Sequence, residues 1–387
     1  MISIQEAIEL IASQPMERQK RSLPVMESLN HYLAEPIIAP MDLPSFDNSA
    51  MDGYAISGDG PSYEIIGEIQ AGDTNTYLCA QGQAFRIFTG ARVPQDCQAV
   101  IMQEKTHVEG GRLTIEDSPD PGKNIRRKGE QIKRGSEVFA TGQKINSSVI
   151  GLLSSFGMTA VNVFSKPGIT LLTTGDELVQ PGQPLKEGQL YESNSHTLRA
   201  TLKQLGFSSG YHHIKDDFDS TRQAIEKQLD RSDVLLISGG ISVGDYDFVK
   251  KALEENGVEE IFYRVFQKPG KPLYFGKKGS KFVFGLPGNP ASSLVCLYVY
   301  VYPLLKKLSG GPFEGLTSFE LPLATSFTLK SDRPSFMKAK IDNNEVQILE
   351  GQGSSMLYSM ATGNALALMD EQKTYNRGEK ISCWLTH

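Results

Sequence analysis

Short apolar segments alternate with helical segments between residues 167 and 311, and this alternation constrains the fold more than any other feature of the chain. Apolar strands are expected at residues 169–174 and 234–238, and helices at about 194–205 and 220–229, with a further helix starting near Tyr246. Strands and helices that alternate at this spacing indicate a parallel sheet with helices on both faces. We therefore expect an α/β domain here.

The sequence on either side of this segment is typical of β-structure. Residues 60–165 hold short strand candidates separated by Gly, Pro and Asp, with one helix near residues 147–155. After residue 312 the alternation of apolar and polar residues predicts a small β-barrel. The expected fold class is multidomain α/β plus β, with a mostly parallel three-layer α/β domain. The expected domains are an N-terminal linker and helical domain (1–45 and 130–166), an inserted β-rich domain (46–129), the α/β domain (167–311) and the barrel (312–387).

Charge and cysteine content exclude several classes of protein. Lys and Arg number 39 against 45 Asp and Glu, and the resulting net charge of −6 argues against a general nucleic-acid binder. The four cysteines are scattered and form no CxxC pair, so neither a zinc knuckle nor a disulfide framework is indicated. We expect no nucleic-acid partner and a reducing compartment.

No membrane-directed segment is predicted. The uncharged stretch 282–305 is interrupted by Gly and Pro, and Pro303 is expected to end the apolar helix that Asn289-Pro290 opens. Its continuous apolar part is shorter than the roughly 18 residues that a span needs. Glu6 and Glu9 lie where a signal peptide would be apolar. The expectation is a cytoplasmic protein without a membrane partner.

The strand ends of the α/β segment are unusually rich in glycine. An open α/β sheet binds ligands at the carboxyl ends of its strands, and three of these ends are TTGDEL (173–178), SGGISVGDYDF (238–248) and GLPGNPASS (285–293). Glycine lets backbone N–H groups approach a phosphate, and helix N-termini favour negative charge. The candidate binding residues at these ends are Gly175, Ser238, Gly239, Gly240, Ser242, Gly244, Pro287 and Pro290.

Carboxylates lie in the same turns and would repel a phosphate unless a divalent cation bridges the two. Mg²⁺ forms such bridges with one or two carboxylates and phosphate oxygens. Glu177 and Asp247 are the best candidate ligands, and Asp216 lies nearby. One Gly-Asp turn is ordinarily a turn or a helix cap, but three Gly-rich ends in one sheet, two of them acidic, favour a phosphate and metal site. No Walker A or GxGxxG pattern supports a P-loop or dinucleotide fold.

Three further segments carry charge. In QKPGKP (267–272) two prolines hold two ammonium groups close together, and an oxyanion between them would relieve their repulsion; a solvated basic turn is the alternative. The loop PSFDNSAMDGYA (44–55) is dense enough in polar groups for a functional loop, or for Asx-turns and caps alone. The basic run NIRRKG (124–129) is typical of a solvated face.

Taken together, these segments resemble the molybdopterin molybdenumtransferase family, which comprises the bacterial MoeA proteins and the E domains of gephyrin and its plant counterpart. The matching stretches keep the family's order and are PSFDNSAMDGYA, RIFTGARVP, GKNIRRKGE, TTGDEL, SGGISVGDYDF, KPGKPLYFG and GLPGNPASS. The resemblance runs from the first helix to the barrel. It implies an elongated homodimer whose active site is shared between subunits, with a possible transient contact to molybdopterin adenylyltransferase.

The implied reaction begins with adenylylated molybdopterin. Its phosphoanhydride is cleaved with Mg²⁺, AMP is released, and molybdate is inserted into the dithiolene of the pterin. The catalytic residues that the resemblance implies are Asp52, Thr89, Glu177, Asp216 and Asp247. Glu177 and Asp247 would hold Mg²⁺, and Asp52 and Thr89 would complete the site from the neighbouring subunit.

The resemblance also implies an oxyanion pocket. Lys268, Lys271 and Ser292 match positions that are thought to hold molybdate in the family, and Arg126 would steady an anionic group. Two positions depart from the family pattern. Gln131 stands where many members carry Asp, so a carboxylate role is not carried over to it. Lys338 stands where relatives often show Arg; Lys keeps the charge but loses the planar fork that suits an oxyanion, which makes Lys338 and Ser354 weak site candidates.

Other functions use the same α/β module. A molybdopterin adenylyltransferase or a nucleotide pyrophosphatase shares the TGDE and SGG strand ends, and a gephyrin-like scaffold would need no catalysis. The segments around Asp52 and Thr89 favour the transferase because single-domain relatives lack them.

Overall fold

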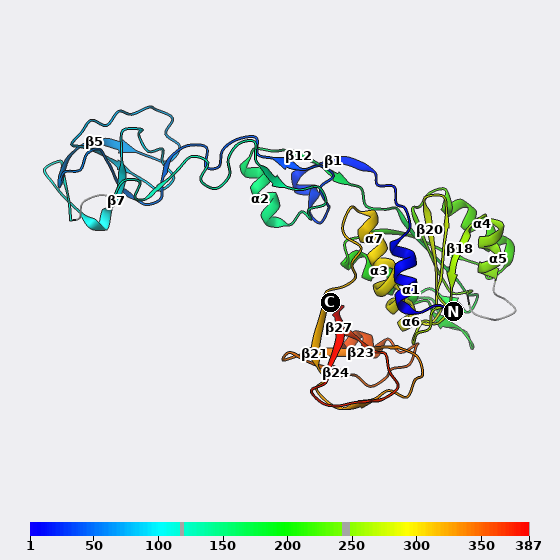
Figure 1. Cartoon of the computed structure of the whole chain (residues 1–387). Helices are drawn as coiled ribbons and strands as arrows, with labels where there is room; N and C mark the ends of the chain where they lie inside the picture. Colours follow the sequence, from blue (N-terminus) through cyan, green and yellow to red (C-terminus); the bar gives the residue numbers. More distant parts are fainter. Residues whose placement is uncertain (117–119, 242–247, 387) are drawn as a thin grey trace. The chain divides into compact units, whose positions relative to one another are not determined.

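The computed structural model describes residues 1–116, 120–241 and 248–386 and is shown in Figure 1. The chain forms two compact units. Unit 1 comprises Met1–Leu23, Asn30–Ala34 and Asn162–His387, and unit 2 comprises Pro24–Leu29 and Glu35–Val161. No helix within the described ranges is long and apolar enough to cross a membrane.

A six-stranded sheet forms the centre of unit 1, in the order β16-β13-β17-β20-β19-β18. Its strands are β13 (Ile169–Thr174), β16 (Ser209–Ile214), β17 (Val234–Ser238), β18 (Glu259–Tyr263), β19 (Tyr274–Lys278) and β20 (Lys281–Leu286). The first four strands in this order are parallel, and β19 and β18 join antiparallel at one edge. The predicted mostly parallel sheet is confirmed.

Helices cover both faces of this sheet (Figure 1). One face carries α1 (Ile4–Ala12), α3 (Asn194–Gln204), α6 (Pro290–Cys296) and α7 (Tyr302–Leu308), and the other carries α4 (Phe218–Leu229) and α5 (Phe248–Glu255). Successive strand residues point to opposite faces, so Leu171 packs in the first core and Leu172 in the second. The carboxyl ends of the four parallel strands, β16, β13, β17 and β20, therefore lie on the same edge of the sheet.

The helical segment after β20 continues past Pro303, and the expectation that this proline ends it is wrong. Between α6 and α7 the chain forms one π-helical segment, Leu297–Val301. The backbone N–H of Tyr302 donates to the carbonyl of Leu297, five residues back. Proline has no N–H to donate, and the wider π turn lets the helix resume with Pro303 in its first turn.

The C-terminal part of unit 1 is an antiparallel sheet in the order β21-β27-β25-β23-β24. Its strands are β21 (Ser318–Pro322), β23 (Ser335–Asp342), β24 (Glu345–Ile348), β25 (Ala365–Met369) and β27 (Lys380–Leu385); β22 (Phe327–Thr328) pairs with β26 (Thr374–Tyr375), and α8 is Tyr358–Thr362. Leu323, just after β21, makes a bridge to Val346 of β24, so the two edge strands approach each other. This curved sheet matches the predicted barrel.

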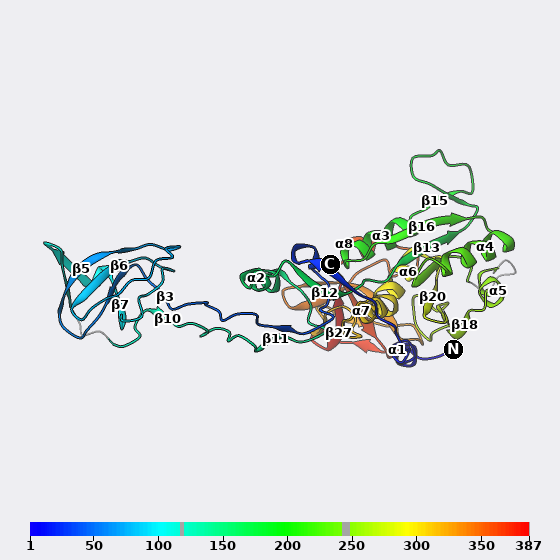
Figure 2. The same cartoon turned by 90° about the horizontal axis from the view of Figure 1, so that it is seen from above.

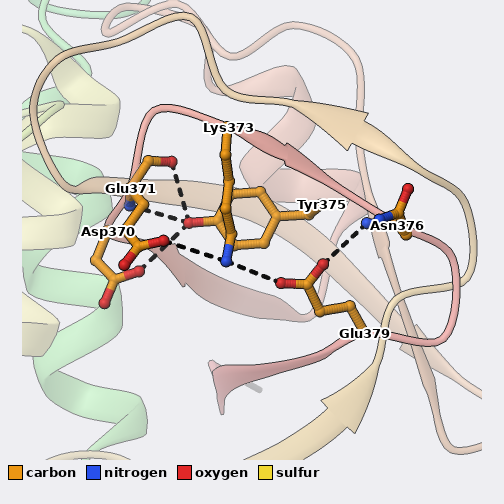
Figure 3. A network of polar contacts seen from close by, with 6 residues as sticks. All are labelled: Asp370, Glu371, Lys373, Tyr375, Asn376 and Glu379. Carbon is orange, nitrogen blue, oxygen red and sulfur yellow. Dashed lines mark hydrogen bonds and ion pairs between the residues drawn. The ribbon is translucent and has the colours of Figure 1, made fainter.

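A polar network fixes the connection between β25 and β27 (Figure 3). The hydroxyl of Tyr375, a buried side chain, accepts from the backbone N–H of Glu371 at 3.0 Å and donates to Asp370 Oδ1 at 3.3 Å. Lys373 Nζ lies 3.2 Å from Glu371 Oε2 and 3.1 Å from Glu379 Oε1. These contacts stabilise a turn, and none of these residues lines the cavity described below.

Unit 2 is built on a second six-stranded sheet, in the order β7-β4-β6-β5-β9-β8. Its strands are β4 (Gly53–Ile56), β5 (Ser62–Ile69), β6 (Gln83–Ile87), β7 (Ala99–Met102), β8 (Thr106–Glu109) and β9 (Arg112–Ile115). Figure 2 shows β5 and β6 side by side, and they pair parallel. The β-rich character predicted for this region is confirmed.

Short elements complete both units. They are β1 (Lys20–Pro24), η1 (Val25–Ser28), β2 (Ile37–Ile38), β3 (Asn48–Ser49), η2 (Gln103–Lys105), β10 (Ile125–Arg126), β11 (Glu137–Phe139), α2 (Ser147–Ser155), β12 (Ala160–Phe164), β14 (Leu178–Val179) and β15 (Leu190–Tyr191). Helix α2 has the predicted bounds, and the side chain of Asn146 caps it by accepting from Val149 N at 2.9 Å.

Candidate active site

A cavity of about 670 Å³ lies at the carboxyl ends of β13, β17 and β20. Eight of the residues predicted from the sequence line it, namely Gly175, Glu177, Asp216, Ser238, Gly239, Gly240, Pro287 and Pro290. Because parallel strands end on the same edge of a sheet, segments more than a hundred residues apart converge here. The fold therefore collects most of the predicted α/β-domain residues around one space.

Acidic side chains crowd one wall of this cavity. A Cβ added to Gly175 would lie 2.8 Å from Glu177 Oε2, so the carboxylate folds back over the strand-end glycine. The backbone N–H of Asp216 donates to Asp176 Oδ1 at 3.3 Å. Burial, together with the negative charges of Asp176, Glu177 and Asp217, raises the pKa of Asp216. This wall concentrates negative charge that a bound cation would offset.

The two adjacent aspartates after β16 have different roles. Asp217 is the N-cap of α4, and its Oδ1 accepts from the backbone N–H of Ser220 at 2.8 Å. This bond is the first cause of the lowered pKa of Asp217. Asp216 makes no such cap and lines the cavity. Asp217 is thus a structural carboxylate, and Asp216 remains available for a ligand.

The acidic wall fits Mg²⁺ better than a metal that needs a complete protein cage. Among the described residues, no group of three or more His, Cys, Asp or Glu side chains is arranged to hold a metal ion. Mg²⁺ keeps several waters and uses one or two carboxylates together with substrate phosphates. Glu177 and Asp216, beside glycine-rich strand ends, supply that kind of partial site.

Asn194, which sequence reasoning missed, ties two of the strand ends together. Its Nδ2 donates to Ser238 Oγ at 3.0 Å and to the carbonyl of Gly288 at 2.7 Å. Its Oδ1 is buried and has no hydrogen-bond partner within the described part of the chain. The preceding Glu192 is buried, lines the cavity and accepts from Ser195 N at 2.8 Å. Only the position of this segment at a helix start could have pointed to it.

The lysine turn is built on a buried glutamine. Lys268 and Lys271 are exposed, whereas Gln267 is fully buried. Gln267 Nε2 donates to the carbonyls of Pro269 and Gly270, each at 3.1 Å, and its Oε1 accepts from the hydroxyl of Tyr300. The interior of the α/β domain therefore fixes the shape of the turn.

Glycine at position 270 lets this turn approach α6. Gly270 has φ +83°, and a Cβ there would lie 2.7 Å from Cys296 Sγ and 3.6 Å from the carbonyl oxygen of Ser292. A side chain would push the turn away from α6. The contact brings the lysine turn next to Ser292, and the neighbouring Pro272 lines the cavity. Lys268, Lys271 and Ser292 are thus close to the cavity but do not line it.

The remaining predicted residues of unit 2 include a tight polar pair. Asp52 Oδ1 accepts from both the backbone N–H and the hydroxyl of Thr89, each at 2.8 Å. These two bonds, the backbone bond first, lower the pKa of Asp52. Asp52 is exposed, so its ionised carboxylate is fixed in direction and open to a ligand.

The polar loop 44–55 and the basic run are one structure. Strand β10 pairs with β3, with Arg126 opposite Asn48. Asp47 accepts from Arg127 Nη1 and from the backbone N–H of Lys128, each at 2.7 Å. Arg127 therefore stabilises the loop through Asp47. Arg126 is exposed, and its side chain has no ion-pair partner among the described residues. This leaves Arg126 available for an anion.

Three predicted residues, Ser242, Gly244 and Asp247, lie outside the described residues. They follow Ile241, which lines the cavity, and precede α5.

Sequence comparisons cover nearly the whole chain. Residues 2–157 match the MoeA N-terminal region (domain I and II), residues 170–307 match a probable molybdopterin binding domain, and residues 320–386 match the MoeA C-terminal region (domain IV). The chain is 33% identical to a molybdopterin molybdenumtransferase of Haemophilus influenzae, over 99% of this chain and 98% of that protein. It is 37% identical to one of Nostoc sp., over 72% of this chain and 67% of that protein.

Solved structures agree with these matches. The molybdopterin biosynthesis MoeA protein of Pyrococcus horikoshii superposes with a TM-score of 0.84 at 29% identity, covering 100% of this chain and 99% of that chain. A solved structure of a molybdopterin biosynthesis MoeA protein from Pyrococcus horikoshii OT3 gives a TM-score of 0.86 at 27% identity, with full coverage of both chains.

Proposed function

Because the chain belongs to the molybdopterin molybdenumtransferase family, we propose that the strand-end cavity binds adenylylated molybdopterin and is where AMP is released. The chain is an enzyme of molybdenum cofactor biosynthesis, with molybdopterin and molybdate as its substrates. The observation that carries the proposal is the convergence of glycine-rich strand ends and acidic side chains on one cavity of about 670 Å³. The glycines let phosphate oxygens approach the backbone N–H groups, which can donate hydrogen bonds to them, and the cavity offers room for the rest of the ligand.

Glu177 and Asp247 are the proposed Mg²⁺ ligands, and Asp216 lines the same cavity as Glu177. Burial first, and then the negative charges of Asp176, Glu177 and Asp217, raise the pKa of Asp216, and a bound cation would offset both effects. Bound Mg²⁺ would supply charge neutralisation at the phosphoanhydride as AMP leaves. The protein's own part is to present these carboxylates to the phosphates, while Asn194 holds the loops of Ser238 and Gly288 in place.

Molybdate is proposed to bind at the lysine turn. Molybdate is a dianion, and the exposed ammonium groups of Lys268 and Lys271 offset its charge. Ser292 approaches the same turn through Gly270. Gln267 acts on this pocket indirectly, because it holds the two carbonyls that shape the turn.

We propose that the enzyme works as a homodimer and that Asp52, Thr89 and Arg126 of the partner subunit complete the site. The ionised, exposed Asp52 and the exposed Arg126 support a ligand-binding role for this face of unit 2. A transient contact with molybdopterin adenylyltransferase would deliver the substrate. The finer division into domains 1–45 with 130–166, 46–129, 167–311 and 312–387 is proposed as well.

A matched pair of variants tests the acidic wall. Asp216→Asn should abolish most Mg²⁺-dependent AMP release, whereas Asp217→Asn should retain it, because Asn is also a good N-cap for α4. The assay measures AMP release from adenylylated molybdopterin at increasing Mg²⁺. Equal activity of the two variants, both folded, would remove Asp216 from the site.

The shared site is tested by subunit complementation. Asp52→Asn and Glu177→Gln homodimers should each be inactive. Mixing them with random subunit exchange should restore about a quarter of the activity, and isolated heterodimers should show about half, because each has one intact site of two. Absence of restored activity in proven heterodimers would contradict the sharing.

A further inference from the structure

Lys338 is a buried cation that the proposed mechanism does not use. It lies in β23, and only 1% of its surface is exposed. Its Nζ donates to the carbonyls of Gly351 at 2.8 Å, Gly353 at 2.7 Å and Met356 at 3.2 Å. A lysine ammonium has three protons, so these carbonyls account for all of them.

This geometry excludes a direct contact between Lys338 and an oxyanion in the observed arrangement. An anion would have to displace a backbone carbonyl, and it would have to enter a site closed to solvent. Burial lowers the pKa of Lys338 to about 8, which reflects the same closure. The ammonium group of Lys338 therefore binds backbone carbonyls of segment 351–356 and no external anion.

A second set of bonds fixes the same segment. The backbone N–H of Lys338 donates to Gln352 Oε1, and Gln352 Nε2 donates back to the carbonyl of Lys338, each at 2.9 Å. Ser359 Oγ donates to the carbonyl of Gly351 at 2.7 Å. The segment contains two glycines, 351 and 353, and so would lose order readily without these contacts.

The fixed segment lies against the proposed substrate pocket. Asn289 Nδ2 donates to Ser354 Oγ at 3.1 Å, and the backbone N–H of Ser292 donates to the carbonyl of Ser354 at 3.3 Å. Ser355 lines the cavity itself. A continuous path of hydrogen bonds therefore runs from Lys338 through the segment to the loop between β20 and α6.

We propose that Lys338 is a positioning residue, which holds segment 351–356 against the β20–α6 loop and so keeps Ser292 and Asn289 in place for the substrates. The inference rests on the proposed substrate pocket. It assigns the C-terminal domain a direct part in shaping that pocket, through backbone carbonyls and without contact to substrate.

The first test compares two lysines of the same strand. Lys338→Met removes the ammonium group at nearly constant length, and Lys340→Met, at an exposed position two residues on, is the matched control. At a temperature where both are folded, Lys338→Met should lower kcat/KM for molybdate-dependent AMP release about 10- to 100-fold. Lys340→Met should stay within about twofold of wild type. Equal rates for the two variants would overturn the proposal.

A double-mutant cycle separates positioning from a role in stability alone. Ser354→Ala removes the hydroxyl contact with Asn289, and its effect on kcat/KM should largely vanish in the Lys338→Met background. Independent, multiplicative effects would contradict a path through the segment. Lys338→Arg keeps a cationic donor and should recover part of the lost rate, and it replaces Lys338→Met if the latter does not fold.

Hydrogen exchange gives a readout that does not depend on turnover. Amides of residues 351–356 should exchange at least about tenfold faster in Lys338→Met than in wild type, with the β13–β17 amides unchanged. Unchanged exchange of the segment would refute the positioning role. If wild type releases no AMP but the amides of residues 351–356 still exchange faster in Lys338→Met, the proposed function fails while the structural role of Lys338 stands.

Discussion

Substitution of Gln267 by Leu should damage both the stability of the α/β domain and the use of molybdate. The change removes the Gln267 donor from the carbonyls of Pro269 and Gly270, of which Gly270 keeps only the long contact from Cys296 Sγ at 3.9 Å. It also takes the Gln267 acceptor from the hydroxyl of Tyr300. An unsatisfied buried polar group costs about 1–3 kcal/mol, and the turn can relax toward water, so we take about 1 kcal/mol for each of three groups. The expected loss is about 3 kcal/mol, or about 6–12 °C in Tm.

The function should change in a specific way. A relaxed turn separates Lys268 and Lys271 from Ser292, so the KM for molybdate should rise about tenfold or more while binding of the adenylylated pterin changes little. Tyr300→Phe is the control, because it leaves both turn carbonyls bonded and should cost about 1 kcal/mol. Calorimetry and molybdate-dependent AMP release measure the two effects. Wild-type stability and molybdate dependence in Gln267→Leu would refute the reasoning.

Further predictions follow from single contacts. Asn194→Ala should lower kcat/KM about 10- to 100-fold with the fold retained, because it removes the hydrogen bonds that link Ser238 to Gly288. Unchanged steady-state kinetics would contradict this. Thr89→Val should raise the pKa of Asp52 toward its ordinary value. A carboxyl whose pKa is lowered on folding stabilises the folded state above its unfolded pKa, and this stabilisation is lost as pH falls through the folded-state pKa. A ¹³C titration of Asp52 should therefore show protonation at a higher pH in the variant than in wild type. Tyr375→Phe should cost about 1 kcal/mol in thermal unfolding without affecting activity.

The sequence was sufficient for the parts of the fold that depend on local pattern. The buried strand β13 and the helix α2 have the bounds expected from the sequence pattern. Strand β18 was missed because its pattern, EEIFY, begins with two glutamates and gains its place by pairing with β19. The prediction that Pro303 ends the helix was wrong because the effect of this proline depends on the π turn before it, which the composition of the helix does not encode.

The candidate site was predictable where glycine and acid coincide at strand ends. The resemblance selected Asp216, but composition and spacing alone could not distinguish it from Asp217, since only the three-dimensional start of α4 assigns Asp217 to a cap. It also could not show that Lys338 is enclosed by carbonyls from residues 351–356, because that arrangement depends on a loop folding back on β23. Long-range hydrogen bonds of this kind leave no mark on local composition.

The most direct test of the account is AMP release from adenylylated molybdopterin by the full chain with Mg²⁺, measured with and without molybdate. The account predicts that molybdate stimulates AMP release and that molybdenum is recovered in the pterin in equal amount. AMP release without molybdenum insertion, or no release by a correctly folded protein, would contradict the proposal that the strand-end cavity and the lysine turn form one active site.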